Sequence, residues 1–398
     1  MMPGRTALLA VVGAAALAVP APAAPAAAAA PACSSPQAAA PTQADVPWPQ
    51  KRYAPERLEA LATGVNVTVA VIDSGVDARH PQLAGRVLAG RDYLDGRDAR
   101  IDCAAHGTAV ASIIAARPRE GAGPRGLAPD ATILPVRVSE LEIIEGEQSG
   151  RTVAAAQFAQ SIRWAVDHGA DVLNLSVVLY RDDPAVRRAV AYAIAKDVVV
   201  VAAAGNLHER SDPVPYPAAY DGVIGVGSIG PDGTRSSFSQ VGPYVDLVAP
   251  GGDVDAAAPV GGHQKANGTS YAAPFVSATA ALIREYRPDL PAAQVAARIL
   301  ATTDPAPGGK PTAYGAGVLN PFRAVTDTVA AAAPRPASTL RRLPADSATL
   351  ARAQRREESR ENSLRLAAAV GGLAGVAVLV AVVLPRGAGR RWRPAEPD

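Results

Sequence analysis

Four short segments carry side chains that are suited to catalysis, and each lies where an apolar run meets a turn. Asp73 ends V-A-V-I-D before Ser-Gly, and His106 opens H-G-T before a run of small residues. Asn206 ends V-V-V-V-A-A-A-G-N, and Ser270 opens an apolar helical pattern after N-G-T. Each has a structural explanation when it is taken alone, such as a turn acid, a structural histidine at a helix start or a serine N-cap.

Together these four residues supply the groups that acyl transfer requires. Ser270 can attack a carbonyl carbon while His106 accepts its proton and later returns it to the leaving amine. Asp73 can orient His106 and stabilise the imidazolium. Asn206 and the backbone N–H of Ser270 can donate hydrogen bonds to the oxyanion. The sequence therefore predicts the catalytic residues Asp73, His106 and Ser270, with Asn206 in the oxyanion hole.

Other titratable residues are weaker candidates for these roles. Asp77 lies past the turn that follows Asp73, and His263 lacks the H-G-T context of His106. His80 is predicted to be structural. The glutamates at 140, 142, 145 and 147 suggest calcium or a basic substrate, but a solvated loop is favoured because no calcium-loop spacing is present. We therefore predict no metal site and no cofactor.

The elements that must position these residues follow from hydrophobic periodicity. Apolar runs of strand length alternate with longer helical patterns, which predicts a parallel sheet covered on both faces. Function is then expected at the carboxyl edge of the sheet. The expected strands are 67–72, 132–138, 171–177, 198–203, 223–228 and 245–248, and the expected helices are 107–116, 153–168, 185–196, 270–286 and 292–301.

Composition excludes several other classes of protein. The chain has 398 residues, and its 39 basic and 37 acidic side chains give a net charge of +2, so a strongly cationic nucleic-acid binder is excluded. Its two cysteines exclude a disulfide-dense scaffold and any four-cysteine zinc or iron–sulfur site. No nucleic-acid partner is predicted.

The two ends of the chain carry targeting signals. Arg5, the apolar stretch 6–19 and several A-x-A options predict a signal peptide over 1–30, with a retained N-terminal anchor as the alternative. Residues 366–384 carry no charge and are followed by arginines, and as a helix they extend about 28 Å. We expect one transmembrane helix there, a cytoplasmic tail over 385–398 and an extracellular catalytic domain at the cell membrane.

The regions between these ends differ in composition. Residues 31–58 form a Pro/Ala-rich extension, 59–325 the predicted catalytic domain and 326–365 an Ala/Pro-rich, then charged, linker. Cys33 lies in the extension, and Cys103 lies three residues before His106. Disulfides persist outside the cell, so we expect a Cys33–Cys103 bridge that makes the extension a permanent belt, with two free thiols as the alternative. The extension is too short for an independent pro-domain, since folds below about 40 residues generally need extra cross-links.

The four segments together resemble the subtilisin-family (subtilase) serine proteases. The matching motifs are D-S-G at 73–75, H-G-T-A-V-A-S at 106–112, A-G-N at 204–206 and G-T-S-Y-A-A-P at 268–274. The resemblance implies a three-layer α/β/α sandwich with a mostly parallel sheet and a protein or peptide substrate.

A further segment is similar to the family's cleft-edge strand, whose backbone pairs with an extended substrate. It contains Asn174 and Ser176, which the resemblance implies are substrate-binding residues. Val177 and Val178 stand where the family often has a glycine, which changes the expected shape of the specificity pocket.

The outer architecture resembles the mycosins, which are membrane-anchored subtilases of type VII (ESX) secretion systems. D-C-A-A-H-G-T at 102–108 adds to this resemblance. It implies a link to type VII protein secretion and partners among the components of the secretion membrane complex. Two alternatives stay open: a structural, non-proteolytic component of that complex, and a general cell-surface protein-processing protease.

Overall fold

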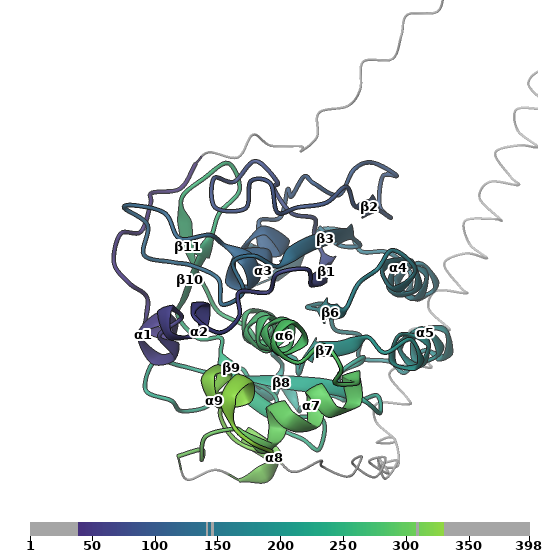
Figure 1. Cartoon of the computed structure of the whole chain (residues 1–398). Helices are drawn as coiled ribbons and strands as arrows, with labels where there is room; N and C mark the ends of the chain where they lie inside the picture. The colour runs from purple at the N-terminus through teal and green to yellow at the C-terminus, as the bar shows by residue number, and fades with distance from the viewer. Residues whose placement is uncertain (1–38, 141, 145–146, 308–309, 330–398) are drawn as a thin grey trace, which may run out of the picture. The chain divides into compact units, whose positions relative to one another are not determined.

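The computed structural model describes residues 39–140, 142–144, 147–307 and 310–329 (Figure 1). The predicted signal peptide, Cys33, the apolar stretch 366–384 and the tail after it lie outside these residues. Among the residues that are described, no helix is long and apolar enough to cross a membrane.

A parallel sheet forms the centre of the domain. Apart from a two-residue edge strand, its strands are buried, mostly apolar and rich in β-branched side chains, which suits a sheet covered on both faces. In spatial order they are β2 (Arg91–Asp92), β3 (Thr132–Arg137), β1 (Thr68–Asp73), β6 (Val172–Leu175), β7 (Val199–Ala203), β8 (Val223–Ile229) and β9 (Leu247–Pro250). Every neighbouring pair is parallel, as the sequence predicts.

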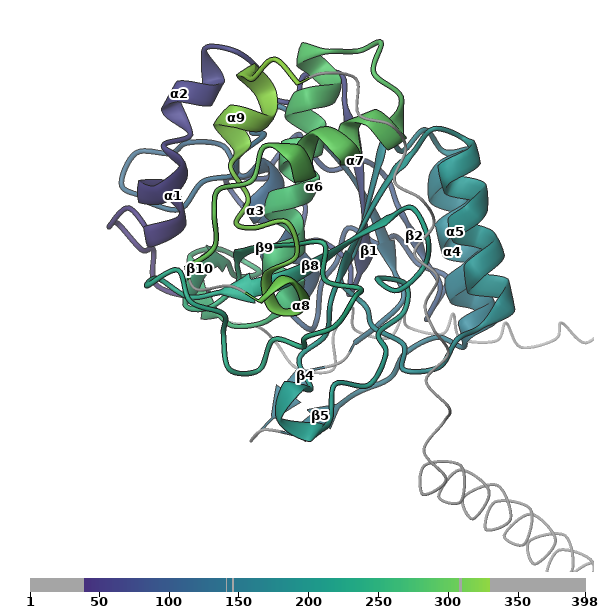
Figure 2. The same ribbon diagram turned by 90° about the horizontal axis from the view of Figure 1, so that it is seen from below.

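Helices cover both faces of this sheet, which confirms the three-layer α/β/α prediction (Figures 1 and 2). Alternation along β1 shows the two faces directly. Val69 and Val71 pack into one core cluster, and Ala70 and Ile72 pack into the other. The first face carries α3 (His106–Ala115), α6 (Thr269–Tyr286), α7 (Ala292–Ala301) and α9 (Pro321–Thr326), and the second carries α4 (Ala155–Asp167) and α5 (Pro184–Ala195).

The described part of the N-terminal extension, which begins at residue 39, folds onto the first of these faces. It contains the short helices α1 (Trp48–Tyr53) and α2 (Glu56–Glu59), which are not predicted from the sequence. Tyr53 places its ring edge-on against Phe275 of α6 at 5.7 Å, and Leu58 is buried in the same core cluster. The part of the extension that is described therefore shares the core of the catalytic domain.

Two antiparallel hairpins and one further short helix lie outside the main sheet. They are β4–β5 (Glu142–Ile144 and Glu147–Ser149), β10–β11 (Val254–Ala257 and His263–Ala266) and α8 (Pro311–Tyr314). The first hairpin replaces the solvated loop expected for the acidic segment. At its base, the Glu140 carboxylate accepts a hydrogen bond from Arg151 Nε at 2.6 Å and also pairs with Arg137.

Candidate active site

Four of the predicted residues lie at ends of core elements. Asp73 is the last residue of β1, and Asn206 follows β7 within a few residues. His106 is the first residue of α3, and Ser270 lies in the first turn of α6. Parallel strands end at the same edge of a sheet, so the helices that begin near this edge bring His106 and Ser270 to Asp73.

The three predicted catalytic side chains form one hydrogen-bonded chain. His106 Nδ1 donates to Asp73 Oδ1 at 2.7 Å, and Ser270 Oγ donates to His106 Nε2 at 2.9 Å. Asp73 is only 2% exposed, and its Oδ1 also accepts the backbone N–H of Ser74 at 2.7 Å. The imidazole is therefore oriented on one side and in contact with the hydroxyl group on the other.

Electrostatics favour a basic imidazole at this position. Burial opposes the charged form of His106 and acts to lower its pKa. The Asp73 carboxylate acts in the other direction through its charge and its hydrogen bond, and the nearby Asp102 adds a further negative charge. The net result is a pKa of His106 above its ordinary value of 6.5.

Asn206 is held by its amide oxygen. Its Oδ1 accepts hydrogen bonds from the backbone N–H and the hydroxyl of Thr269, both at 2.9 Å. The same hydroxyl accepts the N–H of Gly205 at 3.0 Å. A Cβ at Gly268 would lie 3.0 Å from Ser270 Oγ and 3.3 Å from Asn206 Nδ2. The amide donor of Asn206 and the Ser270 hydroxyl therefore lie close together beside Gly268, so both could reach one substrate carbonyl.

Asn174 and Ser176 lie beneath the nucleophile. Asn174 is fully buried, its Oδ1 accepts Ser277 Oγ at 2.9 Å, and its Nδ2 donates to Ser176 Oγ at 2.9 Å. Ser176 Oγ in turn donates to the backbone carbonyl of Ser270 at 3.0 Å. These side chains thus support α6. The ladder of β6 with its two neighbours ends at Leu175, so the predicted backbone pairing with substrate would begin beyond it.

A second buried carboxylate, which sequence reasoning missed, lies near His106. Asp102 is 2% exposed and accepts hydrogen bonds from Ser74 Oγ at 2.8 Å and from Thr108 Oγ1 at 2.6 Å. The sequence signal that could have identified Asp102 is its position four residues before His106, directly before the short Cys-Ala-Ala segment.

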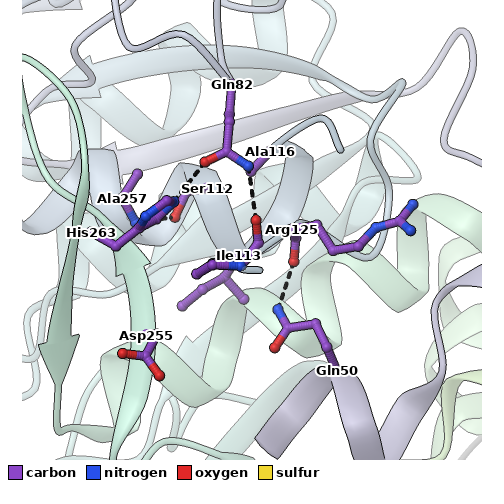
Figure 3. A pocket seen from close by; sticks show the side chains of 10 residues that line it. Gln50, Gln82, Ser112, Ile113, Ala116, Arg125, Asp255, Ala257 and His263 are labelled. Carbon is purple, nitrogen blue, oxygen red and sulfur yellow. Dashed lines mark hydrogen bonds between the residues drawn. The ribbon is translucent and has the colours of Figure 1, made fainter. Parts of the chain in front are cut away.

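The rival histidine His263 lines a polar pocket on another part of the domain (Figure 3). His263 donates through Nε2 to Gln82 Oε1 at 2.7 Å and accepts the backbone N–H of Gln43 at Nδ1 at 3.1 Å. Burial lowers its pKa to about 4, with a smaller contribution from His80. His80 donates to the carbonyl of Gly262 at 3.1 Å, as expected for a structural residue.

The other rival residues also have partners away from the triad. Asp77 accepts hydrogen bonds from Arg79 Nε at 3.0 Å and from the N–H of Val260 at 2.8 Å. Cys103 is half-buried beside the H-G-T motif, and its predicted partner Cys33 lies outside the described residues, so their pairing stays a prediction. Within the described ranges, no three His, Cys, Asp or Glu side chains are grouped so as to hold a metal ion.

Comparisons with known proteins identify the family. The Subtilase family profile matches residues 64–317. Mycosin-4 of Mycobacterium tuberculosis is 38% identical over 302 residues, which are 67% of this chain and 66% of mycosin-4. Thermitase of Thermoactinomyces vulgaris is 34% identical over 289 residues, which are 71% of this chain and 99% of thermitase.

A solved structure is similar over much of the same region. The crystal structure of MycP1 from the ESX-1 type VII secretion system has a TM-score of 0.64 and 32% identity, covering 74% of this chain and 90% of that chain. The match to mycosin-4 spans slightly less than two thirds of that protein. The family match spans more than half of the chain and includes all four predicted catalytic positions. The chain belongs to the subtilase family of serine proteases, with mycosins among its relatives.

Proposed function

We propose that this protein is a membrane-anchored extracellular serine endopeptidase that hydrolyses peptide bonds through Asp73, His106 and Ser270. One observation carries the proposal. The Ser270 hydroxyl, the His106 imidazole and the Asp73 carboxylate form a continuous chain with contacts of 2.9 Å and 2.7 Å. This is the arrangement that an activated serine nucleophile needs.

The proposed first step is acylation of the serine. His106 Nε2 takes the Ser270 proton as Oγ attacks the peptide carbonyl carbon, and the imidazolium formed is stabilised by Asp73. Asn206 Nδ2 and the backbone N–H of Ser270 donate to the oxyanion. His106 then protonates the leaving amine as the C–N bond breaks. Water attacks the acyl-enzyme by the same route in reverse and releases the acid.

The proposed location rests on the sequence and on the relatives. Residues 366–384 would anchor the chain, with the catalytic domain outside the cell and residues 385–398 inside. MycP1 is described as a protein from the ESX-1 type VII secretion system, and its structure is similar to 74% of this chain. We therefore propose a protein substrate linked to type VII secretion, with partners in the secretion membrane complex.

The extension is proposed to stay in place as a belt. The N–H of Ala40 donates to the Gly261 carbonyl at 3.0 Å, and the N–H of His263 donates to the Pro41 carbonyl at 2.9 Å. Trp48 Nε1 donates to the Gly252 carbonyl at 3.1 Å. These contacts tie residues 40–48 to residues 252–263, and the proposed Cys33–Cys103 bridge would be a second attachment.

Hydrolysis of a peptide library by Ser270→Ala tests the proposed chemistry. Ser237→Ala, at an exposed serine away from the triad, is the matched control. We expect Ser270→Ala to lose hydrolysis while it stays folded, and Ser237→Ala to retain the rate of the wild type. Near-normal hydrolysis by Ser270→Ala would contradict the mechanism. Secretion that continues normally in cells carrying only Ser270→Ala would instead favour the structural role.

A further inference from the structure

The start of α3, which carries His106, is capped by residues from outside the helix. The N-cap residue Ala105 has no polar side chain and lies in the left-handed region with φ 64°. The N–H of Gly107 donates instead to Ser74 Oγ at 2.8 Å, and the N–H of Thr108 donates to Asp102 Oδ2 at 2.7 Å. Free N–H groups at a buried helix start need such partners.

Asp102 also spans the turn that contains His106. Its Oδ1 accepts the N–H of Ala104 at 3.1 Å, while its Oδ2 accepts the Thr108 hydroxyl at 2.6 Å. The carboxylate therefore binds the chain on both sides of Ala105 and His106. Left-handed backbone is costly for a residue with a Cβ, so these bonds hold the chain in a conformation that it otherwise disfavours.

Ser74 joins this cap to the catalytic aspartate. Its hydroxyl donates to Asp102 Oδ1 at 2.8 Å, and its backbone N–H donates to Asp73 Oδ1 at 2.7 Å. Asp73 and the turn before α3 are thereby cross-linked on the side of His106 away from the nucleophile.

We propose that Asp102 is a positioning residue that fixes His106 against Asp73 and adds a second negative charge behind the imidazole. This inference rests on the proposed hydrolytic function. The Asp102 carboxylate accepts its hydrogen bonds from Ser74, Ala104 and Thr108, so it acts through the α3 turn and through its charge.

The titratable groups that face His106 come from three places. Asp73 lies on β1, Asp102 precedes α3, and the ring of Tyr271 on α6 lies 4.9 Å from the imidazole. Burial raises the pKa of Asp102 to about 6, although the hydrogen bonds from Thr108 and Ser74 act to lower it. Above that pH the Asp102 charge is present and helps to raise the pKa of His106.

The test is the pH profile of kcat/KM for the full chain with a peptide substrate. Asp102→Asn removes the charge at nearly constant volume and places an amide against donors. We expect turnover to fall about tenfold or more and the acid limb to move down by on the order of half a pH unit. Asp183→Asn is the matched control, because Asp183 caps α5 by accepting the N–H of Ala185 at 2.8 Å, away from the triad.

Two variants at Thr108 keep the test decisive if Asp102→Asn does not fold. Thr108→Val removes the hydroxyl bond to Asp102 and should lower turnover and move the acid limb in the same direction by less. Thr108→Ser keeps the hydroxyl group and should restore the wild-type profile.

Three results would overturn the inference. The first is a wild-type pH profile for Asp102→Asn. The second is an Asp102→Asn protein with reduced turnover and thermal stability but an unmoved acid limb. The third is the same pH profile for Thr108→Val and Thr108→Ser. Failure of the proposed function would look different, because the wild-type activity would then be absent or would survive Ser270→Ala.

Discussion

Asn206 illustrates how single residues are prepared at this site. Its amide oxygen is fixed by two bonds from Thr269, which leaves the amide N–H groups to donate. A donor that is already oriented needs no rearrangement when negative charge develops on the substrate, and this is the basis of electrostatic preorganisation. His106 is prepared in the same way, because each ring nitrogen already has its partner.

Asn206→Ala is expected to lower kcat by about 10²–10³-fold with little change in KM, because the lost bond forms mainly in the transition state. Steady-state kinetics with a peptide substrate measure this. Asn267→Ala is the control, since the Asn267 amide bonds to the backbone N–H of Asp253 at 2.8 Å and should leave kcat unchanged. A loss expressed only in KM would argue against an oxyanion role.

The raised pKa of His106 predicts the pH dependence of hydrolysis. The imidazole must be neutral to accept the Ser270 proton, and a pKa above 6.5 means that it stays charged to a higher pH than an ordinary histidine. Activity should therefore fall as pH decreases through a midpoint above 6.5, as measured by kcat/KM at constant ionic strength. A midpoint below 6.5 would contradict the electrostatic account.

The three residues of the proposed triad could be selected from the sequence, but the residues that support them could not. Asp73, His106 and Ser270 lie at boundaries between apolar runs and turns, which are visible without a structure. Asp102 and Ser74 act through contacts with the turn before α3. No local sequence pattern predicts which aspartate will accept the N–H groups at the start of a buried helix.

At the scale of elements, long apolar runs were predictable and short polar elements were not. Strands such as β7 and helices such as α7 lie where periodicity places them. The last strand of the main sheet, β9, begins two residues later than expected. The backbone N–H groups of Val245 and Asp246 donate instead to the carbonyls of Gly242 and Gly225. β11 has the sequence H-Q-K-A, which becomes a strand only because β10 lies beside it.

The extension gives the prediction at this scale. Cys33 and Cys103 should be recovered as one disulfide-linked peptide when the exported protein is digested without reduction and analysed by mass spectrometry. The bridge closes a loop of about 70 residues and should stabilise the fold by about 4 kcal/mol in the chain-entropy model. Cys33→Ser/Cys103→Ser is therefore expected to melt at a lower temperature than the wild type. Separate unpaired peptides would rule the bridge out.

At the scale of the whole molecule, the last described helix belongs to the core of the catalytic domain. α9 ends at Thr326, and Ala324 and Val325 of that helix are buried in the same core cluster as α3 and α6. Arg298 of α7 bonds to the Val325 carbonyl at 3.2 Å and also to the Ala324 carbonyl, which secures the end of the helix.

Deletion of residues 366–398 should therefore release an active, soluble enzyme. Cell fractionation and peptide hydrolysis measure the two properties separately. Retention of the shortened protein in the membrane fraction would mean that another segment, such as an uncleaved N-terminus, provides the anchor. Loss of activity with normal release would mean that the C-terminal region supports the catalytic domain.

The most direct test of the central claim locates the reactive nucleophile. Full-length protein is treated with a phosphonylating serine-hydrolase probe, and the modified residue is identified by peptide mapping. The account predicts one modified residue, Ser270, with labelling lost in His106→Ala and retained in His263→Ala, which changes the rival histidine. Labelling at another residue, or full labelling of Ser270 in the His106→Ala protein, would contradict it.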